Sequence, residues 1–438
     1  MRNGTRKNFR TIYAAAINAV MPDYAAYLQG GYISETYKRE SYKKLYVIGF
    51  GKASCQMMKG IESALSVPID NGILITRYGH CQGILFENKN IDVHEAGHPV
   101  PDYAGAQATG QVIELLNKAD KNTLVVCLIS GGGSALLVSP CDGVTIEEKQ
   151  VVTEMLLNAG ADIHELNTVR KHISSVKGGR LAEIAYPARV ISLILSDVIG
   201  DKLDVIASGP TAADSSTFKD ALTVISRVDV IKKIPEKVVE ALLKGDAGLI
   251  PETPKSENPV FGNVSNIIIG NNAMAINAAK GKAEFLGYET YVNPLPVAGE
   301  AKKAGLELAE KAIDMYVKAD RQNRKICVIS GGETTVKVKG PGKGGRNTEL
   351  ALAFAKRIEE VKGISILSAG TDGTDGPTDA AGAFADSTTI ARAGEKGINP
   401  DLYLDNNDTY TFFKELNDLF ITGPTGTNVT DLQIIVIE

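Results

Sequence analysis

Short apolar runs recur along the whole chain and are separated by segments of helical period. The runs have the length and the β-branched composition of buried strands, and residues 103–119 and 347–360 repeat apolar side chains at helical spacing. Strands that alternate with helices form mostly parallel sheets with helices on both faces. The sequence therefore predicts an α/β fold. The runs are 45–50, 72–76, 123–129, 190–196, 266–270, 325–330, 364–370 and 432–438.

The chain length and one polar stretch predict two domains. At 438 residues the chain exceeds the usual size of one domain. Residues 244–266 are dense in Pro, Gly, Ser and Asn and follow neither period, which is typical of a linker. We expect a larger, Rossmann-like N-terminal domain over residues 1–250 and a smaller C-terminal α/β domain over residues 251–438.

Composition limits the partners. The net charge of -5 predicts no general attraction to nucleic acid or to an anionic membrane. No apolar run approaches the ~18 residues of a membrane span, and the basic N-terminal segment is typical of an amphipathic helix rather than a signal peptide. The five cysteines form no C-x-x-C pair, so we expect reduced thiols in a cytoplasmic protein. A homodimer is compatible with these features.

The first apolar run leads into GFGKAS (49–54), which matches neither of two well-known nucleotide loops. A P-loop needs Gly at position 46 and Ser or Thr at 53, where this chain has Tyr46 and Ala53. A dinucleotide fingerprint needs Gly or Ala at 54 and an acidic residue after the next strand, where Ser54 and Arg77 stand. An arginine there can accept a 2′-phosphate, so this reading is weakened and stays open. Lys52 nevertheless lies in the first turn beyond a strand, a position that favours anion binding.

A second loop, LISGGGSALL (128–137), has two readings. Glycines without a Cβ let backbone amides converge on an anion, and serine hydroxyls can donate to it. Alternatively, the glycines only turn the chain between two packed elements, and the sequence leaves both readings open. The candidate phosphate-binding residues of the two loops are Gly51, Ser130, Gly131, Gly132, Gly133 and Ser134.

Further charged residues follow buried runs or flank glycines. Arg170 and Lys177 belong to a strongly cationic segment (166–182) around a glycine pair, and we expect both to bind substrate or phosphate. Asp197 follows the run 190–196 directly. Arg346 precedes a helical segment. Asp372 and Asp375 lie in a glycine-rich loop after the run 364–370, where they serve either as turn residues or as Mg²⁺ ligands.

Cations, glycine turns and carboxylates together indicate phosphoryl transfer. That reaction needs neutralised phosphate charge, a metal that bridges the donor phosphates and an oriented hydroxyl. The five histidines show no zinc-binding spacing, and no G-x-S-x-G surrounds Ser130 or Ser134.

Eight segments carry a longer, more specific pattern. They are GFGKAS (49–54), EAGHPVPD (95–102), LISGGGSALL (128–137), LNTVRKHISSVKGGRLA (166–182), LSDVIGDKLDVIASGPT (195–211), ISGGETTVKVKGPGKGGRNTELALAFA (329–355), AGTDGTDGPTDAAGA (369–383) and TGPTGTNVTDLQIIVI (422–437). Together they resemble the glycerate 2-kinase family, whose C-terminal part is called the MOFRL domain. The resemblance runs from about residue 45 to the C-terminus.

The resemblance implies phosphorylation of D-glycerate to 2-phosphoglycerate by ATP with Mg²⁺, in a cleft between two α/β domains. It implies that Lys52 and Arg346 are active-site cations, and that Glu333 and Asn428 are further residues of the cleft. With Asp197 we take the two cations as the catalytic set. The main alternative is an NAD(P)H-dependent hydroxypyruvate reductase, a label that some relatives carry; a non-catalytic sensor of sugar acids or nucleotides is a third class.

Overall fold

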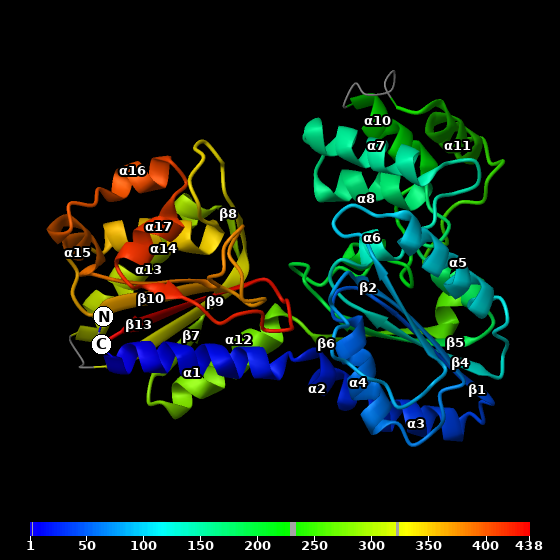
Figure 1. Cartoon of the computed structure of the whole chain (residues 1–438), viewed down its shortest axis with the longest axis horizontal. Coiled ribbons are helices and arrows are strands. Elements are labelled where there is room, and N and C mark those ends of the chain that lie inside the picture. The colour runs from blue at the N-terminus through cyan, green and yellow to red at the C-terminus, as the bar shows by residue number, and fades with distance from the viewer. Residues whose placement is uncertain (2, 228–233, 321–323) are drawn as a thin grey trace. The chain divides into compact units, whose positions relative to one another are not determined.

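The computed structural model describes residues 1, 3–227, 234–320 and 324–438. The chain divides into two compact units, shown in Figure 1. Pro22–Ile269 form one unit, which we name the parallel-sheet unit. Met1–Met21 and Gly270–Glu438 form the other, which we name the mixed-sheet unit.

The parallel-sheet unit contains a six-stranded sheet in the order β3-β2-β1-β4-β5-β6. Its strands are β1 (Lys44–Phe50), β2 (Asn71–Arg77), β3 (Ile91–Ala96), β4 (Thr123–Ile129), β5 (Arg189–Leu195) and β6 (Val264–Gly270). The pairs from β3 to β5 are all parallel. The chain runs outward from β1 to β3 and then returns to start again at β4, so a topological switch point lies between β1 and β4. This order confirms the Rossmann-like expectation.

Helices surround this sheet and form a small extra bundle. The helices are α2 (Pro22–Tyr27), α3 (Gly30–Arg39), α4 (Ser54–Ala64), α5 (Tyr103–Leu116), α6 (Gly133–Leu136), α7 (Ile146–Asn158), α8 (Ile163–His172), α9 (Arg180–Ala185), α10 (Phe218–Arg227) and α11 (Glu236–Asp246), with short 3-10 turns η1 (Ile206–Ser208) and η2 (Pro259–Asn263). Apolar residues of α7, α8, α10 and α11 make a core of their own, separate from the core on the sheet.

The mixed-sheet unit has a seven-stranded sheet in the order β12-β11-β10-β13-β9-β7, with β8 paired to β9. The strands are β7 (Glu289–Val292), β8 (Val297–Glu300), β9 (Ile326–Thr335), β10 (Ile364–Gly370), β11 (Gly382–Asp386), β12 (Leu419–Phe420) and β13 (Asp431–Ile437). Four pairs are antiparallel and only β7 and β8 are parallel to β9. The expectation of mostly parallel strands is wrong for this sheet.

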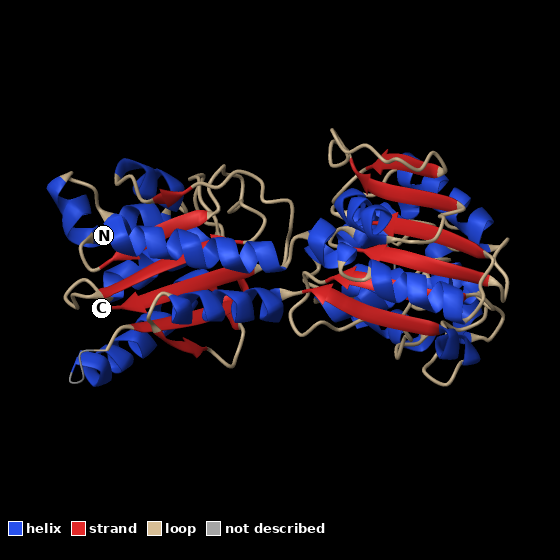
Figure 2. Ribbon diagram, turned by 90° about the horizontal axis from the view of Figure 1, so that it is seen from below, coloured by secondary structure: helices blue, strands red, loops and turns tan. Residues whose placement is uncertain are grey.

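Burial on both faces explains that difference. β10 and β13 are buried at every position, so they read as continuous apolar runs, the pattern that is typical of parallel strands. The covering helices, which Figure 2 shows on both faces of the sheet, are α1 (Asn3–Ala19), α12 (Asn272–Phe285), α13 (Ala301–Asp320) and α14 (Arg346–Arg357); α15 (Thr389–Glu395), α16 (Pro400–Asp405) and α17 (Thr409–Glu415) complete the unit.

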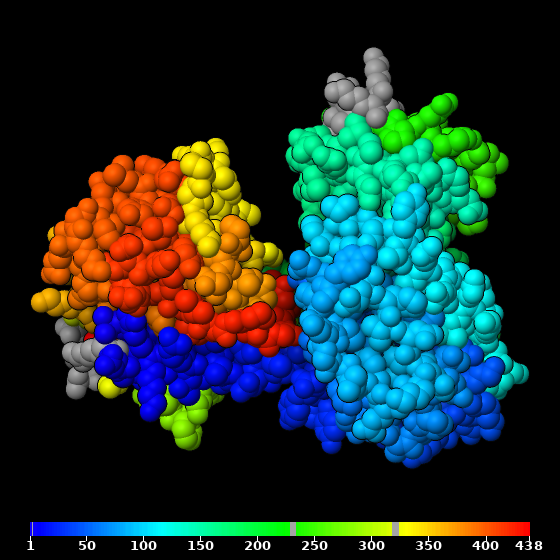
Figure 3. All heavy atoms as spheres, in the orientation of Figure 1, coloured from blue at the N-terminus to red at the C-terminus, as the bar shows by residue number. Residues whose placement is uncertain are grey.

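The unit boundary differs from the expected one at residues 250 and 251 in two respects. β6 completes the parallel sheet, so the chain stays in that unit until Ile269. The amphipathic helix α1, expected from the sequence, packs with the C-terminal part of the chain, along whose surface it lies in Figure 3. Its Tyr13 hydroxyl donates to the Gly370 carbonyl at 2.7 Å, and its Thr5 hydroxyl donates to Glu438 at 3.1 Å.

Candidate active site

The two glycine loops of the parallel-sheet unit lie side by side at the switch point. Phe50 and Ile129, the last residues of β1 and β4, are paired, so GFGKAS and SGGGS leave the sheet together. The Lys52 amide donates to the Gly131 carbonyl at 2.9 Å, and the Ala53 amide donates to the Ser130 hydroxyl at 3.0 Å. Ser130 is therefore buried, and its hydroxyl connects the two loops by a hydrogen bond instead of facing a ligand.

Close neighbours explain the glycine triplet. A Cβ at Gly131 would overlap the carboxylate of Asp197, and one at Gly132 would lie 2.9 Å from the His98 ring. A Cβ at Gly133 would lie 2.9 Å from Ala207. Gly132 also has φ +86°, a left-handed conformation that suits glycine. The packing reading of this loop is thus supported, and two of the neighbours that it admits, Asp197 and His98, are polar.

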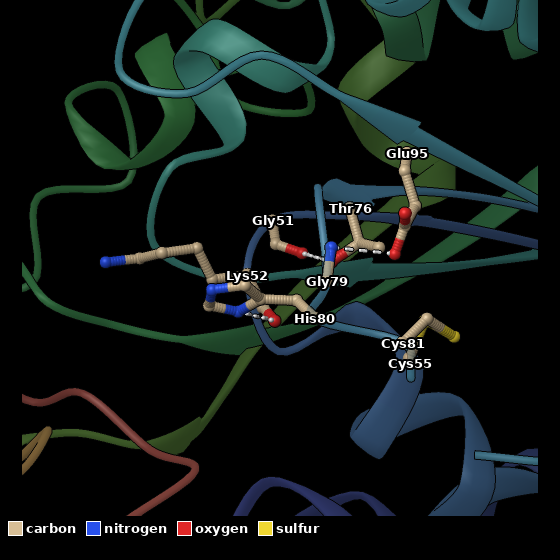
Figure 4. The surroundings of a disulfide bond; sticks show 8 residues. All are labelled: Gly51, Lys52, Cys55, Thr76, Gly79, His80, Cys81 and Glu95. Carbon is tan, nitrogen blue, oxygen red and sulfur yellow. Dashed lines mark hydrogen bonds between the residues drawn. A yellow bond between two sulfur atoms is a disulfide. The ribbon is translucent and has the colours of Figure 1, made fainter. Parts of the chain in front are cut away.

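Lys52, His98 and Asp197 gather around this triplet. Gly132 brings the His98 ring and the Lys52 side chain together, since the same Cβ position would lie 3.4 Å from Lys52 Cγ. The Lys52 ammonium forms no ion pair with any residue that the structure describes, and Figure 4 shows it pointing away from the neighbouring strands. A lysine without an ion-pair partner beside a glycine turn is a candidate site for an anionic ligand.

Two histidines that the sequence reasoning set aside border Lys52. The Nδ1 of His80 donates to the Lys52 carbonyl at 3.2 Å (Figure 4). Burial, followed by the nearby charge of Lys52, lowers the pKa of His98 to about 4, and burial also lowers the pKa of His80. Both rings are therefore neutral at physiological pH. The motif EAGHPVPD contains His98. The histidines have no zinc-binding spacing, so nothing further in the sequence selected His98.

A strained turn supports the same loop. Ala207 and Ser208, within the IASGP segment, have φ +51° and +61°. Such backbone is costly for residues other than glycine and concentrates at functional sites. The Ser208 hydroxyl donates to Asn167 at 3.1 Å, so Ser134, 2.9 Å away, donates to Ser208. Nothing in the sequence reasoning had selected Ser208.

Lys177, in the cationic segment at 166–182, stabilises neighbouring backbone and exposes no charge to a ligand. Lys177 is fully buried and donates to the Leu137 carbonyl at 3.2 Å, just after the glycine loop. Burial, and then Lys149 and Arg170, keep the pKa of Lys177 well below its usual value. These contacts correct the expectation that Lys177 binds phosphate. Arg170 is half-buried and has no hydrogen bond to the described residues through its side chain, so it is retained as a candidate.

In the mixed-sheet unit, Arg346 is held by two carboxylates. Its Nε donates to Asp431 at 2.7 Å and its Nη2 donates to the other oxygen at 2.9 Å, while Nη1 contacts Glu333. Burial raises the pKa of Asp431 to about 6 against the lowering effect of Arg346. Asp431 completes the motif TGPTGTNVTD, but the sequence reasoning chose only Asn428 from it.

The backbone before Asp431 is strained and well anchored. Thr430 has φ +70°, an unusual value for a β-branched residue. Its carbonyl accepts from the Thr371 amide at 2.9 Å, and its hydroxyl accepts from the Asn272 amide group at 3.0 Å. Asn428 turns the chain by accepting from the Thr430 amide at 3.1 Å. These contacts fix the carboxylate that orients Arg346.

The two aspartates expected to bind metal have different surroundings. Asp375 is buried and accepts from the Asn347 and Thr348 amides, both at 2.8 Å, and from the Thr348 hydroxyl, so it caps helix α14. Asp372 is half-buried and uses one oxygen to accept from the Thr374 amide at 3.0 Å. The contacts of Asp375 are those of a cap, not of a metal ligand, whereas Asp372 has an oxygen left for Mg²⁺.

No group of three or more His, Cys, Asp or Glu side chains that could hold a metal occurs among the described residues. Mg²⁺ does not require one, because it often takes one or two carboxylates together with substrate phosphates and water. Asp372 therefore fits a magnesium ion that arrives with a nucleotide.

The cysteines include one bonded pair. Cys55, in the first turn of α4, and Cys81, after β2, form a disulfide with a Cα–Cα distance of 5.6 Å (Figure 4). The expectation of reduced thiols is wrong for these two residues and holds for Cys127, Cys141 and Cys327. Their spacing along the chain gave no sign of a pair, because the sheet brings together the segments after β1 and β2.

No helix in the described parts of the chain is long and apolar enough to cross a membrane.

The fold and the two sets of site residues define an α/β enzyme class with a Rossmann-like unit and a separate mixed-sheet unit. Comparison with known proteins agrees with this class. Residues 8–243 match a domain of unknown function, DUF4147, and residues 326–431 match the MOFRL family. The D-glycerate 2-kinase of Thermotoga maritima is 42% identical over 97% of both chains, and the glycerate 2-kinase of Pyrococcus horikoshii is 40% identical over 97% of this chain and 93% of its own.

Solved structures give the same result. The crystal structure of glycerate kinase from Thermotoga maritima superimposes with a TM-score of 0.88 at 42% identity and covers 100% of both chains. The chain belongs to the glycerate 2-kinase family. A relative from Agrobacterium vitis whose name includes hydroxypyruvate reductase is 40% identical over 89% of this chain.

Proposed function

We propose that this protein transfers the γ-phosphoryl group of ATP to the 2-hydroxyl of D-glycerate, in the presence of Mg²⁺, and releases 2-phosphoglycerate. The observation that carries the proposal is the gathering of Lys52, His98 and Asp197 around the Gly131–Gly133 turn at the switch point of a Rossmann-like sheet. The glycerate 2-kinases at about 40% identity support it.

Phosphoryl transfer depends on charge neutralisation and orientation. Lys52 stabilises negative charge that grows on the transferred group or on the glycerate carboxylate. Asp197, two residues after β5, accepts the proton of the glycerate hydroxyl as its oxygen bonds to the γ-phosphorus and the bond to the β-phosphate oxygen breaks, which releases ADP. The neutral His98 ring offers a hydrogen bond without adding a charge that would compete with Lys52.

The mixed-sheet unit carries a second set of candidate groups. Arg346 presents a guanidinium whose orientation is fixed by Asp431 and Glu333. Asp372 would hold Mg²⁺, which supplies charge to the phosphates when it is bound. Asp431 must be ionised to hold Arg346 firmly. Because its pKa is raised to about 6, its pairing with Arg346 should weaken as the pH falls below about 6.

The competing reductase is tested in the same experiment. Purified protein is given ATP, Mg²⁺ and D-glycerate in one assay, and NADH or NADPH with hydroxypyruvate in the other. We expect ADP and phosphoglycerate in the first and no oxidation of nicotinamide in the second. Oxidation without phosphoryl transfer would replace the kinase proposal. Arg77 at the end of β2, where an NAD site would carry an acidic residue, counts against NADH but would suit the 2′-phosphate of NADPH, so both cofactors are tested.

We also propose that the protein works in the cytoplasm, where ATP and small sugar acids are both present. Fractionation of cells that express the native chain tests this location. Recovery of the activity outside the cytoplasmic fraction would contradict it, and would suit the Cys55–Cys81 disulfide, since such bonds are uncommon in the cytosol.

A further inference from the structure

The mixed-sheet unit contains a cavity of about 680 Å³. The cavity lies among the end of β9, the glycine-rich loop at 339–345, the start of α14 and the loop at 372–377, so all its walls belong to one unit. Its volume falls within the range of about 300–1,000 Å³ that is usual for small-molecule sites. Two of its lining residues, Arg346 and Asp372, belong to the proposed reaction, and the rest of the space has no role in it.

The walls of the cavity are preformed. The side-chain oxygen of Asn407 accepts from the amides of Lys339 and Gly340, at 2.7 and 3.1 Å, and so fastens the glycine-rich loop. A Cβ at Gly344 would overlap Thr409, so the glycines serve close packing of this loop rather than freedom of motion. The Asn407 amide group donates to Glu349 Oε2 at 3.1 Å, which also fixes the acid on the cavity wall.

One buried acceptor on the cavity wall lacks a partner. Glu349 is 1% exposed, and its Oε1 has no hydrogen-bond partner among the described residues. Burial raises the pKa of this carboxyl group. The guanidinium of Arg346 already pairs with Asp431 and Glu333. A ligand that offers hydroxyl or amino groups would satisfy the oxygen of Glu349, whereas another carboxylate would not.

The remaining wall is apolar and open. Val336, Val338 and Pro377 line it, and Val338 is 76% exposed although it stands beside a cavity. An exposed valine beside a rigid glycine loop is a surface on which a planar ring can pack. Arg346 and Asp372 lie on the same cavity and provide a charged part of the wall.

We propose that this cavity binds the nucleoside part of ATP, with its hydroxyl or amino groups donating to Glu349 and its base against Val336 and Val338. The phosphates then lie toward Arg346 and Asp372. This inference rests on the proposed function, which supplies the nucleotide. D-Glycerate is a poorer occupant, because a three-carbon acid leaves most of the volume empty and brings a carboxylate to a wall that already carries Glu349 and Asp372.

Two variants test the site by binding alone. Thr374→Trp fills the cavity from an exposed position, and Val338→Asn makes its apolar wall polar. Leu402→Trp is the matched control, because Leu402 is 67% exposed on α16 of the same unit and does not line the cavity. Isothermal titration calorimetry measures the affinity of each protein for ADP with Mg²⁺, for tripolyphosphate and for D-glycerate.

We expect Thr374→Trp to weaken ADP binding by at least about tenfold and Val338→Asn to weaken it severalfold. D-Glycerate should bind to both variants as to the wild type, and tripolyphosphate should bind to Val338→Asn as to the wild type. Unchanged ADP affinity in both variants would overturn the inference. Loss of D-glycerate binding in Thr374→Trp, or of tripolyphosphate binding in Val338→Asn, would also overturn it, by assigning the cavity to the acid or its Val338 wall to the phosphate chain.

The same measurements separate this inference from the proposed function. If the wild type binds ADP in the expected way but does not phosphorylate D-glycerate, the kinase proposal fails and the nucleoside site remains. If the wild type is an active kinase and both variants keep its ADP affinity, the kinase proposal remains and the nucleoside site is wrong.

Discussion

Lys52 and Arg346 are held in different ways, and this difference shapes what their removal should do. Lys52 has no ion-pair partner among the described residues, so its charge is available to a ligand. Arg346 makes paired hydrogen bonds with Asp431 and a further contact with Glu333, which orient one planar group. A flexible cation and a fixed one suit two tasks in phosphoryl transfer, binding of an anion and stabilisation of charge at a defined place.

We expect Lys52→Ala and Arg346→Ala each to lower kcat by about 10²–10³, the effect of removing one preorganised electrostatic group. Lys59→Ala, in the middle of α4 and paired with Glu62, is the control and should keep the wild-type kcat. Steady-state kinetics with ATP and D-glycerate give the values. A near-normal kcat for either variant would remove that residue from the site.

Asp372 and Asp375 should separate into a metal ligand and a helix cap. Asp372→Asn should raise the Mg²⁺ concentration needed for half-maximal turnover with little effect on stability, because an amide lacks the charge that the ion requires. Asp375→Asn should lower the free energy of unfolding by about 1–2 kcal/mol, the usual effect of weakening a cap. Magnesium titrations and urea unfolding distinguish them. If Asp372→Asn needs the same Mg²⁺ concentration as the wild type and Asp375→Asn, Asp372 is a turn residue only.

The depressed pKa of His98 predicts a dependence of stability on pH. Its pKa is about 4 when folded, against about 6.5 for an unfolded histidine. Between these values the unfolded chain binds more protons, so the His98 contribution to stability is lost as the pH falls from about 6.5 toward 4. Urea unfolding at several pH values should show a shallower decline for His98→Gln than for the wild type. Parallel curves would show that His98 is not buried as described.

The glycine loop shows how one turn serves both packing and the site. Its three glycines leave room for Asp197, His98 and Ala207, so the turn that allows close packing also assembles polar groups. The loop lies beside Lys52 because β1 and β4 are parallel neighbours in the sheet. The strand order therefore explains why GFGKAS and SGGGS, which are far apart in the sequence, lie in contact.

A pair of glycine variants tests the crowding directly. Gly132 and Gly143 have similar left-handed φ values of +86° and +83°, but a Cβ at Gly143 would meet nothing within 4 Å. Gly132→Ala should therefore lose more stability than Gly143→Ala and should also displace His98 from Lys52, which lowers kcat. Thermal unfolding and kinetics of both variants measure the difference. Equal effects would mean that only the backbone conformation matters at Gly132.

Across the whole chain, the sequence was sufficient for the α/β class, the Rossmann-like sheet and the neighbourhood of Lys52, because buried strands followed by glycine loops have a local signature. It was insufficient wherever distant segments determine the structure. The antiparallel β10 and β13 look like parallel strands because both faces are covered, and α1 joins a unit formed by residues far along the chain. His98, Ser208 and Asp431 acquire their surroundings only when the sheets are formed.

The most direct test of the account is the position of the phosphate on the product. The protein is incubated with ATP, Mg²⁺ and D-glycerate, and the product is identified by ³¹P NMR against 2-phosphoglycerate and 3-phosphoglycerate, with Lys52→Ala as a parallel sample. The account predicts 2-phosphoglycerate, formed at a rate that falls by about 10²–10³ in the variant. Phosphorylation at the 3-hydroxyl, or no phosphoryl transfer to D-glycerate by the wild type, would contradict it.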